Sequence, residues 1–415
     1  MADVRAAAEA VFRQESGRII ASLIRISGSF DLAEEAVQEA FTSALANWPV
    51  HGIPQNGVAW IMATAHRKLI DAVRRQNTRD QKQEELRYAL QASNAWPADP
   101  EDGSMHFPDD RLRLIFTCCH PALNREAQIA LTLRTLGGLT TAEIAKAFLV
   151  PETTLAQRLV RAKHKICEAR IPYEVPPANR LPERLTSVQA VIYLIFNEGY
   201  TAAAGDHLVR TDLCAEAIRL GRLLCDLMPA DPENLALLAL MLLHDSRRAV
   251  RVRDGDLITL EEQDRLQWDQ SAIDEGVRLL EKALTFGAAG NYQLQAAIAA
   301  LHAQARTPAD TDWRQIAALY GRLLERSPSP VIALNQAVAV AMVEGLEVGL
   351  KRMDELGAAA RLDDYYLFHA ARADILRRLN RKSAAAEAYR RALALATNGI
   401  ERNFLQKRLA AISAS

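Results

Sequence analysis

The chain lacks the features that mark secreted and membrane proteins. Its 415 residues include only five cysteines, at positions 118, 119, 167, 214 and 225. This scatter gives no disulfide framework and fits a reducing compartment. The longest purely apolar run, Leu235–Leu243, is far shorter than the ~20 residues that span a bilayer. The N-terminal sequence MADVRAAAEAVFRQ is typical of an amphipathic helix rather than a signal peptide. We therefore expect a cytoplasmic, soluble protein with no membrane partner.

The chain also lacks an excess of charge of one sign, and it lacks catalytic motifs. It carries 50 basic and 51 acidic residues, a formal net charge of −1, so any affinity for nucleic acid must be local. No P-loop, dinucleotide fingerprint or nucleophile elbow is present. The Cys118-Cys119-His120 triplet has no second ligand pair at zinc spacing. We therefore expect no catalytic residue, no metal and no cofactor, and we predict that the protein is not an enzyme.

What the chain has in abundance is helical periodicity. Hydrophobic residues make up 49% of it and charged residues 24%, which is ordinary for a folded soluble protein. Few segments alternate with a period of two, whereas nearly all place apolar residues at helical spacing. The sequence therefore predicts an all-α fold, and its length allows two or three domains with cores of their own.

Residues 140–166 have the pattern of a helix-turn-helix with a basic second helix. Thr140 and Glu143 form a capping box that starts the first helix, and Pro151 suits the first turn of the second. The second helix has an apolar face of Leu155, Leu159, Ala162 and Ile166 and a basic face of Arg158, Arg161 and Lys165. One face can pack into a small domain while the other meets a DNA major groove. The alternative is an amphipathic helix whose basic face is merely solvated.

Residues 1–77 predict four helices, of which the last two are the most informative. The third spans Asp31–Trp48 and the fourth spans about 55–76, with the proline- and glycine-containing loop 49–57 between them. The fourth helix has an apolar stripe of Val58, Met62, Ala65, Leu69 and Val73 and carries the cations Arg67, Lys68, Arg74 and Arg75. An ordinary structural role for Arg74 and Arg75 is stabilisation of the helix C-terminus by about 0.3–1 kcal/mol.

The rest of the chain divides by composition. Residues 78–108 are polar and turn-rich, which predicts a flexible linker, and residues 109–171 form a second helical unit that ends in the helix-turn-helix. From 183 to 415 the pattern is one of stacked helical hairpins, with similar segments at 333–356 and 369–396. Their offset is close to the tetratricopeptide period of about 34 residues, so we predict a tetratricopeptide-like (TPR-like) extension. The charged stretch 247–269 is a candidate partner or ligand site, or a solvated hairpin loop.

Taken in order, these motifs resemble bacterial RNA polymerase sigma factors of the extracytoplasmic-function (ECF) type. The resemblance is to the subgroup with a long C-terminal TPR-like extension. It is carried by DLAEEAVQEAFTSALANW and AWIMATAHRKLIDAVRRQ, then by DDRLRLIFTCCHPAL and ALTLRTLGGLTTAEIAKAFLVPETTLAQRLVRAKHKI. In the extension it is carried by YLIFNEGY, EEQDRLQWD, AAIAALHAQA and SPSPVIALNQAVAVA. It covers essentially the whole chain.

The resemblance implies that residues 1–77 are sigma region 2, which binds the clamp helices of the largest subunit of core RNA polymerase and opens the −10 promoter element. Region 2 would contact the polymerase through Glu35, Gln38 and Glu39. An acidic face suits a basic coiled coil, although exposed charge is more often only solvated. The implied −10 contacts are His51, Gln55, Asn56, Arg67, Lys68, Arg74 and Arg75. Asn and Gln amides can read a base edge, and cations can hold the unpaired strand.

The resemblance further implies that residues 109–171 are sigma region 4, which binds the −35 element as duplex DNA. The implied contacts are Glu152, Thr153, Thr154, Gln157, Arg158, Arg161 and Lys165. Arg158 and Arg161 are the best candidates for guanine or phosphate. The acidic linker is expected either to mimic nucleic acid in the polymerase or to act as a disordered tether.

The expected function is therefore that of a sigma factor, with core RNA polymerase and promoter DNA as its partners. The extension at 183–415 is expected to regulate the sigma domains by docking onto them or to bind a partner protein. The alternative is a stand-alone helix-turn-helix regulator or scaffold with no polymerase contact. The region from Asp31 to Arg75 argues against it, because such a regulator needs no acidic helix followed by a strand-capturing one.

Overall fold

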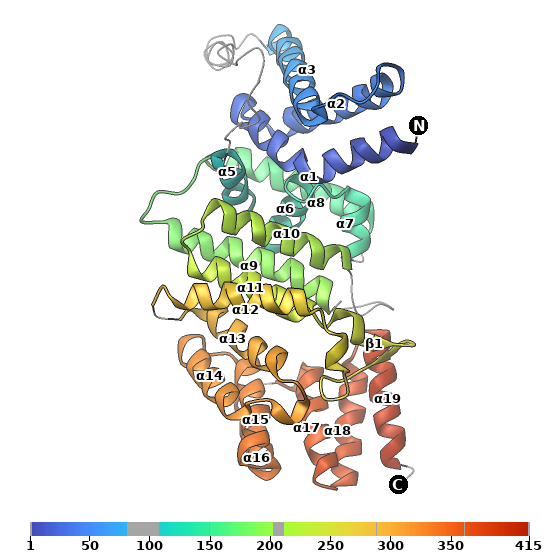
Figure 1. The fold of residues 1–415 in the computed structure, drawn as a ribbon, viewed down its shortest axis with the longest axis vertical. Helices are drawn as coiled ribbons and strands as arrows, with labels where there is room; N and C mark the ends of the chain where they lie inside the picture. The colour runs from blue at the N-terminus through green and yellow to red at the C-terminus, as the bar shows by residue number, and fades with distance from the viewer. Residues whose placement is uncertain are drawn as a thin grey trace. The chain divides into compact units, whose positions relative to one another are not determined.

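The computed structural model describes residues 2–80, 108–148, 150–201, 211–287, 289–360 and 362–413. The chain forms two compact units, Met1–Leu194 and Ile195–Ser415. The first contains α1 (Ala2–Ser27), α2 (Phe30–His51), α3 (Gly57–Asp80), α5 (Pro108–Cys118), α6 (Arg125–Thr135), α7 (Thr141–Ala147), α8 (Glu152–Glu168) and most of α9 (Leu181–Tyr200) (Figure 1). These helices confirm the predicted all-α fold.

The first three helices pack on one another as a small bundle. The prediction of four helices in this region is wrong, because α1 continues without a break to Ser27. Ser29 caps α2 by accepting a hydrogen bond from the backbone N–H of Leu32. At its other end α2 runs past Trp48 and through Pro49 to His51. The predicted stripe of α3 is buried at Met62, Ala65, Leu69 and Val73 and half-buried at Val58.

The helices α5 to α8 do not stand apart from this bundle, because α1 also packs on α5 and α6. Ile19, Leu23 and Ile24 of α1 are at most 2% exposed, and burying such side chains contributes about 1.5–3 kcal/mol each. The contact is close, since a Cβ atom on Gly17 would lie 3.0 Å from the carbonyl oxygen of Leu136. Of the predicted linker 78–108, residues 81–107 lie outside the described residues, while 78–80 belong to α3 and Pro108 to α5.

The second unit is built from helices that pack in succession. They are α10 (Thr211–Leu227), α11 (Pro232–Asp245), α12 (Gln270–Leu284), α13 (Asn291–Gln304), α14 (Trp313–Arg326), α15 (Pro330–Glu344), α16 (Leu346–Ala360), α17 (Tyr366–Arg378), α18 (Lys382–Leu395) and α19 (Gly399–Ser413), with short 3-10 turns at 248–250, 265–267, 308–310 and 362–364. Packing of each helix on the next is typical of helical-repeat proteins.

A short hairpin interrupts this helical pattern after α11. Strand β1 (Val252–Arg253) pairs antiparallel with β2 (Asp256–Leu257). Asp254 and Gly255 form the turn with φ of 54° and 80°, the left-handed conformations that a two-residue hairpin requires. The sequence analysis did not predict these strands.

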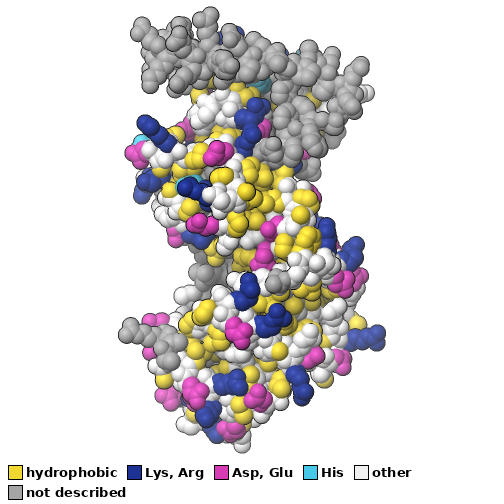
Figure 2. All heavy atoms as spheres, turned by 90° about the vertical axis from the view of Figure 1, so that its left-hand side faces the viewer, with side chains coloured by type: hydrophobic (Ala, Val, Ile, Leu, Met, Phe, Trp, Pro, Cys, Tyr) yellow, Lys and Arg dark blue, Asp and Glu magenta, His cyan; other side chains and the backbone are white. Residues whose placement is uncertain are grey.

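The charged stretch 247–269 is anchored to the last helices rather than freely solvated. Lys407 Nζ of α19 lies 2.5 Å from a carboxylate oxygen of Asp256, and Arg408 Nη2 lies 2.6 Å from Glu262. Arg378 of α17 pairs with Glu261. These partly exposed pairs contribute little each, but together they fix the segment against α17 and α19. On the face drawn in Figure 2, basic and acidic side chains are interspersed, so cationic surface must be local.

Two histidines of the second unit are held in their neutral form. Burial, and then the cations of Arg247 and Arg251, lower the pKa of His244 to about 3. Burial, and then Arg247 and Arg265, lower the pKa of His302 to about 4. Both side chains border the same small hollow beside Trp268. Protonation of either would place a further positive charge among arginines, so the folded state excludes it.

We predict that acid destabilises the second unit below about pH 6.5. The unfolded chain takes up protons at these histidines near pH 6.5 and the folded chain does not until pH 3–4, so stability is present above pH 6.5 and lost as the pH falls. The expected loss is on the order of 1 kcal/mol per pH unit for each histidine. Hydrogen exchange across residues 240–305 between pH 7 and pH 5 measures it. The double variant His244→Gln/His302→Gln should show a smaller change of stability with pH. The control His164→Gln, at an exposed site, should show the same change as the wild type. An equal change in the wild type and both variants would contradict the prediction.

None of the described helices combines the length and the apolar character needed to cross a bilayer.

Candidate nucleic-acid interface

The helix-turn-helix forms as the sequence predicts. The backbone N–H of Thr140 donates to Glu143 Oε2 at 2.7 Å, and the N–H of Glu143 donates to Thr140 Oγ1 at 3.1 Å, which completes the capping box before α7. Leu155, Leu159, Ala162 and Ile166 of α8 are all buried. Pro151 stands one position earlier than predicted, at the N-cap of α8. Burial of this apolar stripe therefore determines which face of α8 is exposed to solvent.

The predicted −35 contacts lie together on the available face of α8, at or near its N-terminal two-thirds. All are exposed except Arg158, which is half-buried. The set consists of Glu152, Thr153, Thr154, Gln157, Arg158, Arg161 and Lys165. The guanidinium of Arg161 donates to the amide oxygen of Gln157 at 3.3 Å, so these two side chains are pre-positioned on one turn. Glu152 lies in the first turn, where a carboxylate is favoured by the helix dipole.

Lys163 of α8 makes a contact with α2 that the sequence analysis missed. Its ammonium group lies 2.7 Å from Glu34 Oε2 and 2.9 Å from Asp31 Oδ1, both at the start of α2. Burial works against the charge, but the pairs with Glu34 and Asp31 outweigh it and raise the pKa of Lys163. The lysine side chain is only 14% exposed. No local sequence signal could have identified this contact, because Lys163 lies 132 and 129 residues along the chain from Asp31 and Glu34.

The carboxylate of Glu39 on α2, a candidate polymerase contact, pairs with two candidate DNA contacts on α3. Glu39 of α2 lies 3.2 Å from Lys68 Nζ and 3.9 Å from Arg75 Nη2 of α3. The sequence analysis gave Glu39 to the polymerase and the two cations to the −10 strand. Glu35 and Gln38, by contrast, are exposed on α2. The structure therefore places Glu39 as a neutralising partner of the α3 cations.

The loop between α2 and α3 is shorter than predicted. His51 is the last residue of α2 rather than a loop residue, so the loop consists of residues 52–56 and includes the exposed Gln55. Asn56 caps α3, because its Oδ1 accepts from the backbone N–H of Ala59 at 2.9 Å. Trp48 packs edge-on against Trp60, with 5.8 Å between ring centroids, and this contact fixes both ends of the loop.

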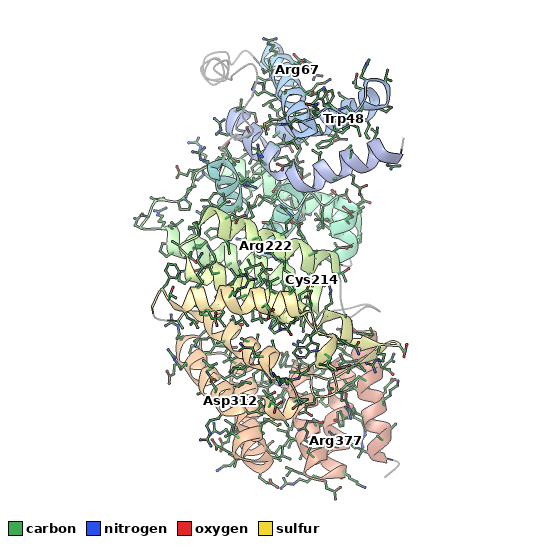
Figure 3. The ribbon with its side chains drawn as sticks, viewed as in Figure 1. Trp48, Arg67, Cys214, Arg222, Asp312 and Arg377 are labelled. Carbon is green, nitrogen blue, oxygen red and sulfur yellow. The ribbon has the colours of Figure 1, made fainter. Side chains whose placement is uncertain are left out.

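The outer face of α3 carries the remaining −10 candidates. Arg67 and Arg74 are exposed. The Arg67 Nε donates to the carbonyl oxygen of Ala63 at 3.3 Å, which lays its guanidinium along the helix. Figure 3 labels Arg67 on α3 and Trp48 on the neighbouring α2. The four cations thus belong to α3, and the loop with Gln55 and Asn56 leads directly into its N-terminus.

Cys118 and Cys119 are core residues. Each thiol is buried beside a threonine hydroxyl, with 3.3 Å from Cys118 Sγ to Thr135 Oγ1 and 3.6 Å from Cys119 Sγ to Thr132 Oγ1. Burial raises the pKa of Cys119 to about 11, and it raises that of Cys118 further. Among the described residues no group of three or more His, Cys, Asp or Glu side chains could hold a metal ion.

Comparison with known families matches three parts of the chain. Residues 11–79 match the model of sigma-70 region 2, and residues 113–166 match that of sigma-70 region 4. Residues 184–284 match a family of unknown function (DUF6596). The first two matches cover the bundle of α2 and α3 and the helix-turn-helix.

Similar proteins include sigma factors. An uncharacterised protein of Rhizobium meliloti (strain 1021) is 45% identical over 390 residues, 94% of this chain and 92% of that protein. The probable ECF RNA polymerase sigma factor SigI of Mycobacterium tuberculosis is 27% identical over 169 residues, 41% of this chain and 57% of that protein. The ECF RNA polymerase sigma factor SigK of the same species is 26% identical over 143 residues, 34% of this chain and 74% of that protein. No solved structure matches the chain.

We predict that Glu39→Gln increases binding of single-stranded DNA. Loss of the carboxylate frees Lys68 and Arg75 for phosphate, and each freed cation adds to the affinity and to its dependence on salt. Fluorescence anisotropy with a labelled single strand at several salt concentrations measures both quantities. Gln38→Ala, on the same helix but without a cation partner, is the control. Unchanged affinity and salt slope in Glu39→Gln would contradict the assignment of these cations.

Proposed function

The chain belongs to the ECF family of RNA polymerase sigma factors, and from this premise we propose how its surfaces divide the work of promoter recognition. As a sigma factor it binds core RNA polymerase and promoter DNA and directs transcription initiation. The single observation that supports the division is the presence of two separate helices, α3 and α8, that each bury an apolar stripe and carry exposed cations.

We propose that α8 reads the −35 element as duplex. Its exposed residues include Arg158 and Arg161, which can pair with guanine or phosphate, and Gln157, whose amide can reach a base edge. The short hydroxyl side chains of Thr153 and Thr154 stand at the N-terminal end, the end that helix-turn-helix proteins insert into the groove.

We propose that α3 and the loop before it capture the unpaired −10 strand. The cations Arg67, Lys68, Arg74 and Arg75 would hold phosphates, and His51, Gln55 and Asn56 would contact bases. The side chains of Val50, in the last turn of α2, and Ile53, in the loop, support this role, because they are 75% and 42% exposed and offer apolar surface to an unstacked base.

We propose that the exposed face of α2, with Glu35 and Gln38, meets the clamp helices of the largest polymerase subunit. An acidic face is complementary to a basic coiled coil. Glu39 contributes indirectly in this proposal, because it neutralises cations of α3.

We propose that the second unit regulates the sigma domains or binds a partner protein. A cavity of about 1060 Å³ between α12 and the end of α13 supports partner binding. Arg278 and Arg306 line it together with the apolar Ile273 and Val277, which is the mixture found in sites that hold a ligand of opposite charge.

We predict that Arg158→Ala/Arg161→Ala weakens binding to −35 duplex by about 1–3 kcal/mol per lost contact and lowers its salt dependence. Affinity for core polymerase should stay unchanged. Glu35→Lys, the matched control on α2, should lower polymerase affinity and leave duplex binding intact. Run-off transcription and electrophoretic shifts on a promoter library measure both. The opposite pattern would show that the two surfaces are assigned the wrong way round.

We predict that removal of the second unit changes promoter-dependent transcription. The cut belongs after Tyr200 rather than near residue 180, because Arg184 donates to the carbonyl oxygen of Phe116 at 2.6 Å and Leu185 and Val188 are buried. Output is compared with the full chain in a reconstituted assay, after circular dichroism has verified the fold. Equal output in that assay and in cells would contradict a regulatory role.

A further inference from the structure

Three of the segments that carry the sequence resemblance in the extension meet at one place in the second unit. Tyr200 ends YLIFNEGY, Trp268 belongs to EEQDRLQWD and His302 belongs to AAIAALHAQA. Trp268 and His302 both border the small hollow between α11 and α13, two helices that pack on each other (Figure 1). The ring of Tyr200 lies 5.4 Å from that of His244, which lines the same hollow. None of the proposed DNA, polymerase and partner surfaces includes this cluster.

The hollow has the size of one small ion. Its volume is about 20 Å³, which exceeds the ~10–15 Å³ that a single water-sized body needs. A carboxylate or a phosphate group has three or more heavy atoms and requires more room than this. The polar lining consists of His244, Arg247, Trp268 and His302, and the other lining side chains are Leu or Ala. Size therefore restricts the occupant to a water molecule or a monoatomic ion.

The polar lining offers mainly hydrogen-bond donors. Trp268 is 5% exposed, and its Nε1–H, which can only donate, has no partner among the described residues. The Nδ1 atom of His302 is also buried without a partner in this part of the chain, and it donates in one of the two neutral tautomers. The guanidinium of Arg247 only donates, and it lies 3.4 Å from His244 Nδ1. Water needs acceptors for its own protons, whereas an anion needs only donors, so the lining favours an anion.

Positive charge surrounds the hollow without ion pairs to neutralise it. Within the described ranges, no carboxylate forms an ion pair with Arg247, Arg251 or Arg265. Arg251 is 9% exposed and stacks on Tyr200, 3.7 Å from the ring centroid. Burial, and then the charge of Arg247, lower the pKa of Arg265, so these cations repel one another. Buried charge is unfavourable unless it is paired, and an anion in the hollow would supply the missing partner.

We propose that this hollow is a halide site, in which chloride is bound by Arg247, Trp268 and His302 and neutralises the surrounding arginines. The ion joins α11, the segment before α12, and α13 around one charge. Because its ligands come from three separate segments, it binds the folded chain and not the unfolded one, and it stabilises the second unit. The site is independent of the proposed contacts with DNA and polymerase.

Bromide tests the site in the full chain, because it resembles chloride in charge and size and quenches tryptophan fluorescence on contact. Sodium bromide replaces sodium acetate at constant ionic strength while the emission is recorded. Binding at a site gives a fall in emission that saturates, whereas random collision gives a fall that continues in proportion to bromide. We expect a saturable fall. Chloride, a far weaker quencher, should displace the bromide and restore the emission.

Two pairs of variants assign the signal to the hollow. Trp268→Phe removes a ligand and the reporter, so it should abolish the saturable fall, whereas Trp60→Phe, in the first unit, should retain it. Arg247→Gln should weaken bromide binding at least about tenfold, because a charged donor is lost. Arg247→Lys keeps the charge and should weaken it less. Arg322→Gln removes an exposed cation of α14 and should bind bromide as the wild type does.

Stability gives a second readout that does not depend on the fluorescence of Trp268. Chloride at about 100 times its dissociation constant should raise the folding equilibrium constant of the second unit about 100-fold relative to acetate. Hydrogen exchange across residues 240–305 at constant ionic strength measures this gain. Arg247→Gln should lose the gain, and Arg322→Gln should keep it.

A fall in emission that never saturates in the wild type would overturn the proposal, because it would leave only random collision. A saturable fall that survives in Trp268→Phe, or that is as strong in Arg247→Gln as in the wild type, would also overturn it. Equal protection by acetate and chloride would show general screening of charge and would have the same consequence. Circular dichroism verifies the fold of each variant, and the wild-type titrations decide the question even where a variant does not fold.

Discussion

Burial of α1 on both sides is the constraint on which the first unit depends. Its apolar residues pack against α2 and α3 and also against α5 and α6, so one helix supplies a common core for the two surfaces that we propose to contact DNA. Separation of α2 and α3 from α5 and α6 exposes that core to water. The buried apolar area corresponds to a free-energy cost of several kcal/mol. A partner with a large interface can supply such an amount, whereas a short duplex with a few phosphate contacts is a weaker source.

Local chemistry explains what the sequence could predict. The stripe Leu155, Leu159, Ala162 and Ile166 follows from helical period, and the capping box at Thr140 follows from the spacing of two side chains; both are confirmed. The all-α fold follows in the same way. The roles of the predicted polymerase and DNA contacts remain predictions.

The sequence could not predict what depends on tertiary contacts. A glycine inside a helix is unfavourable by about 1 kcal/mol, so the sequence alone favours a helix break at Gly17. The structure explains the glycine, because the backbone of Leu136 lies close to where a side chain would be. Lys163 looks like one more cation on a basic helix until its partners Asp31 and Glu34 are seen. The same holds for Glu39, whose neighbours on α3 come from another helix, and for the hairpin after α11, which is too short to show a strand pattern.

The cap on α3 limits how Asn56 can serve its proposed role of contacting a base. One lone pair of its side-chain oxygen is engaged by the backbone N–H of Ala59, which leaves one further lone pair and the NH₂ group for other partners. The capping bond also restrains the plane of the amide. A two-bond pair with a base is therefore possible only in the orientation that the end of the helix sets, so a structural duty at one terminus dictates the angle at which a nucleotide can approach.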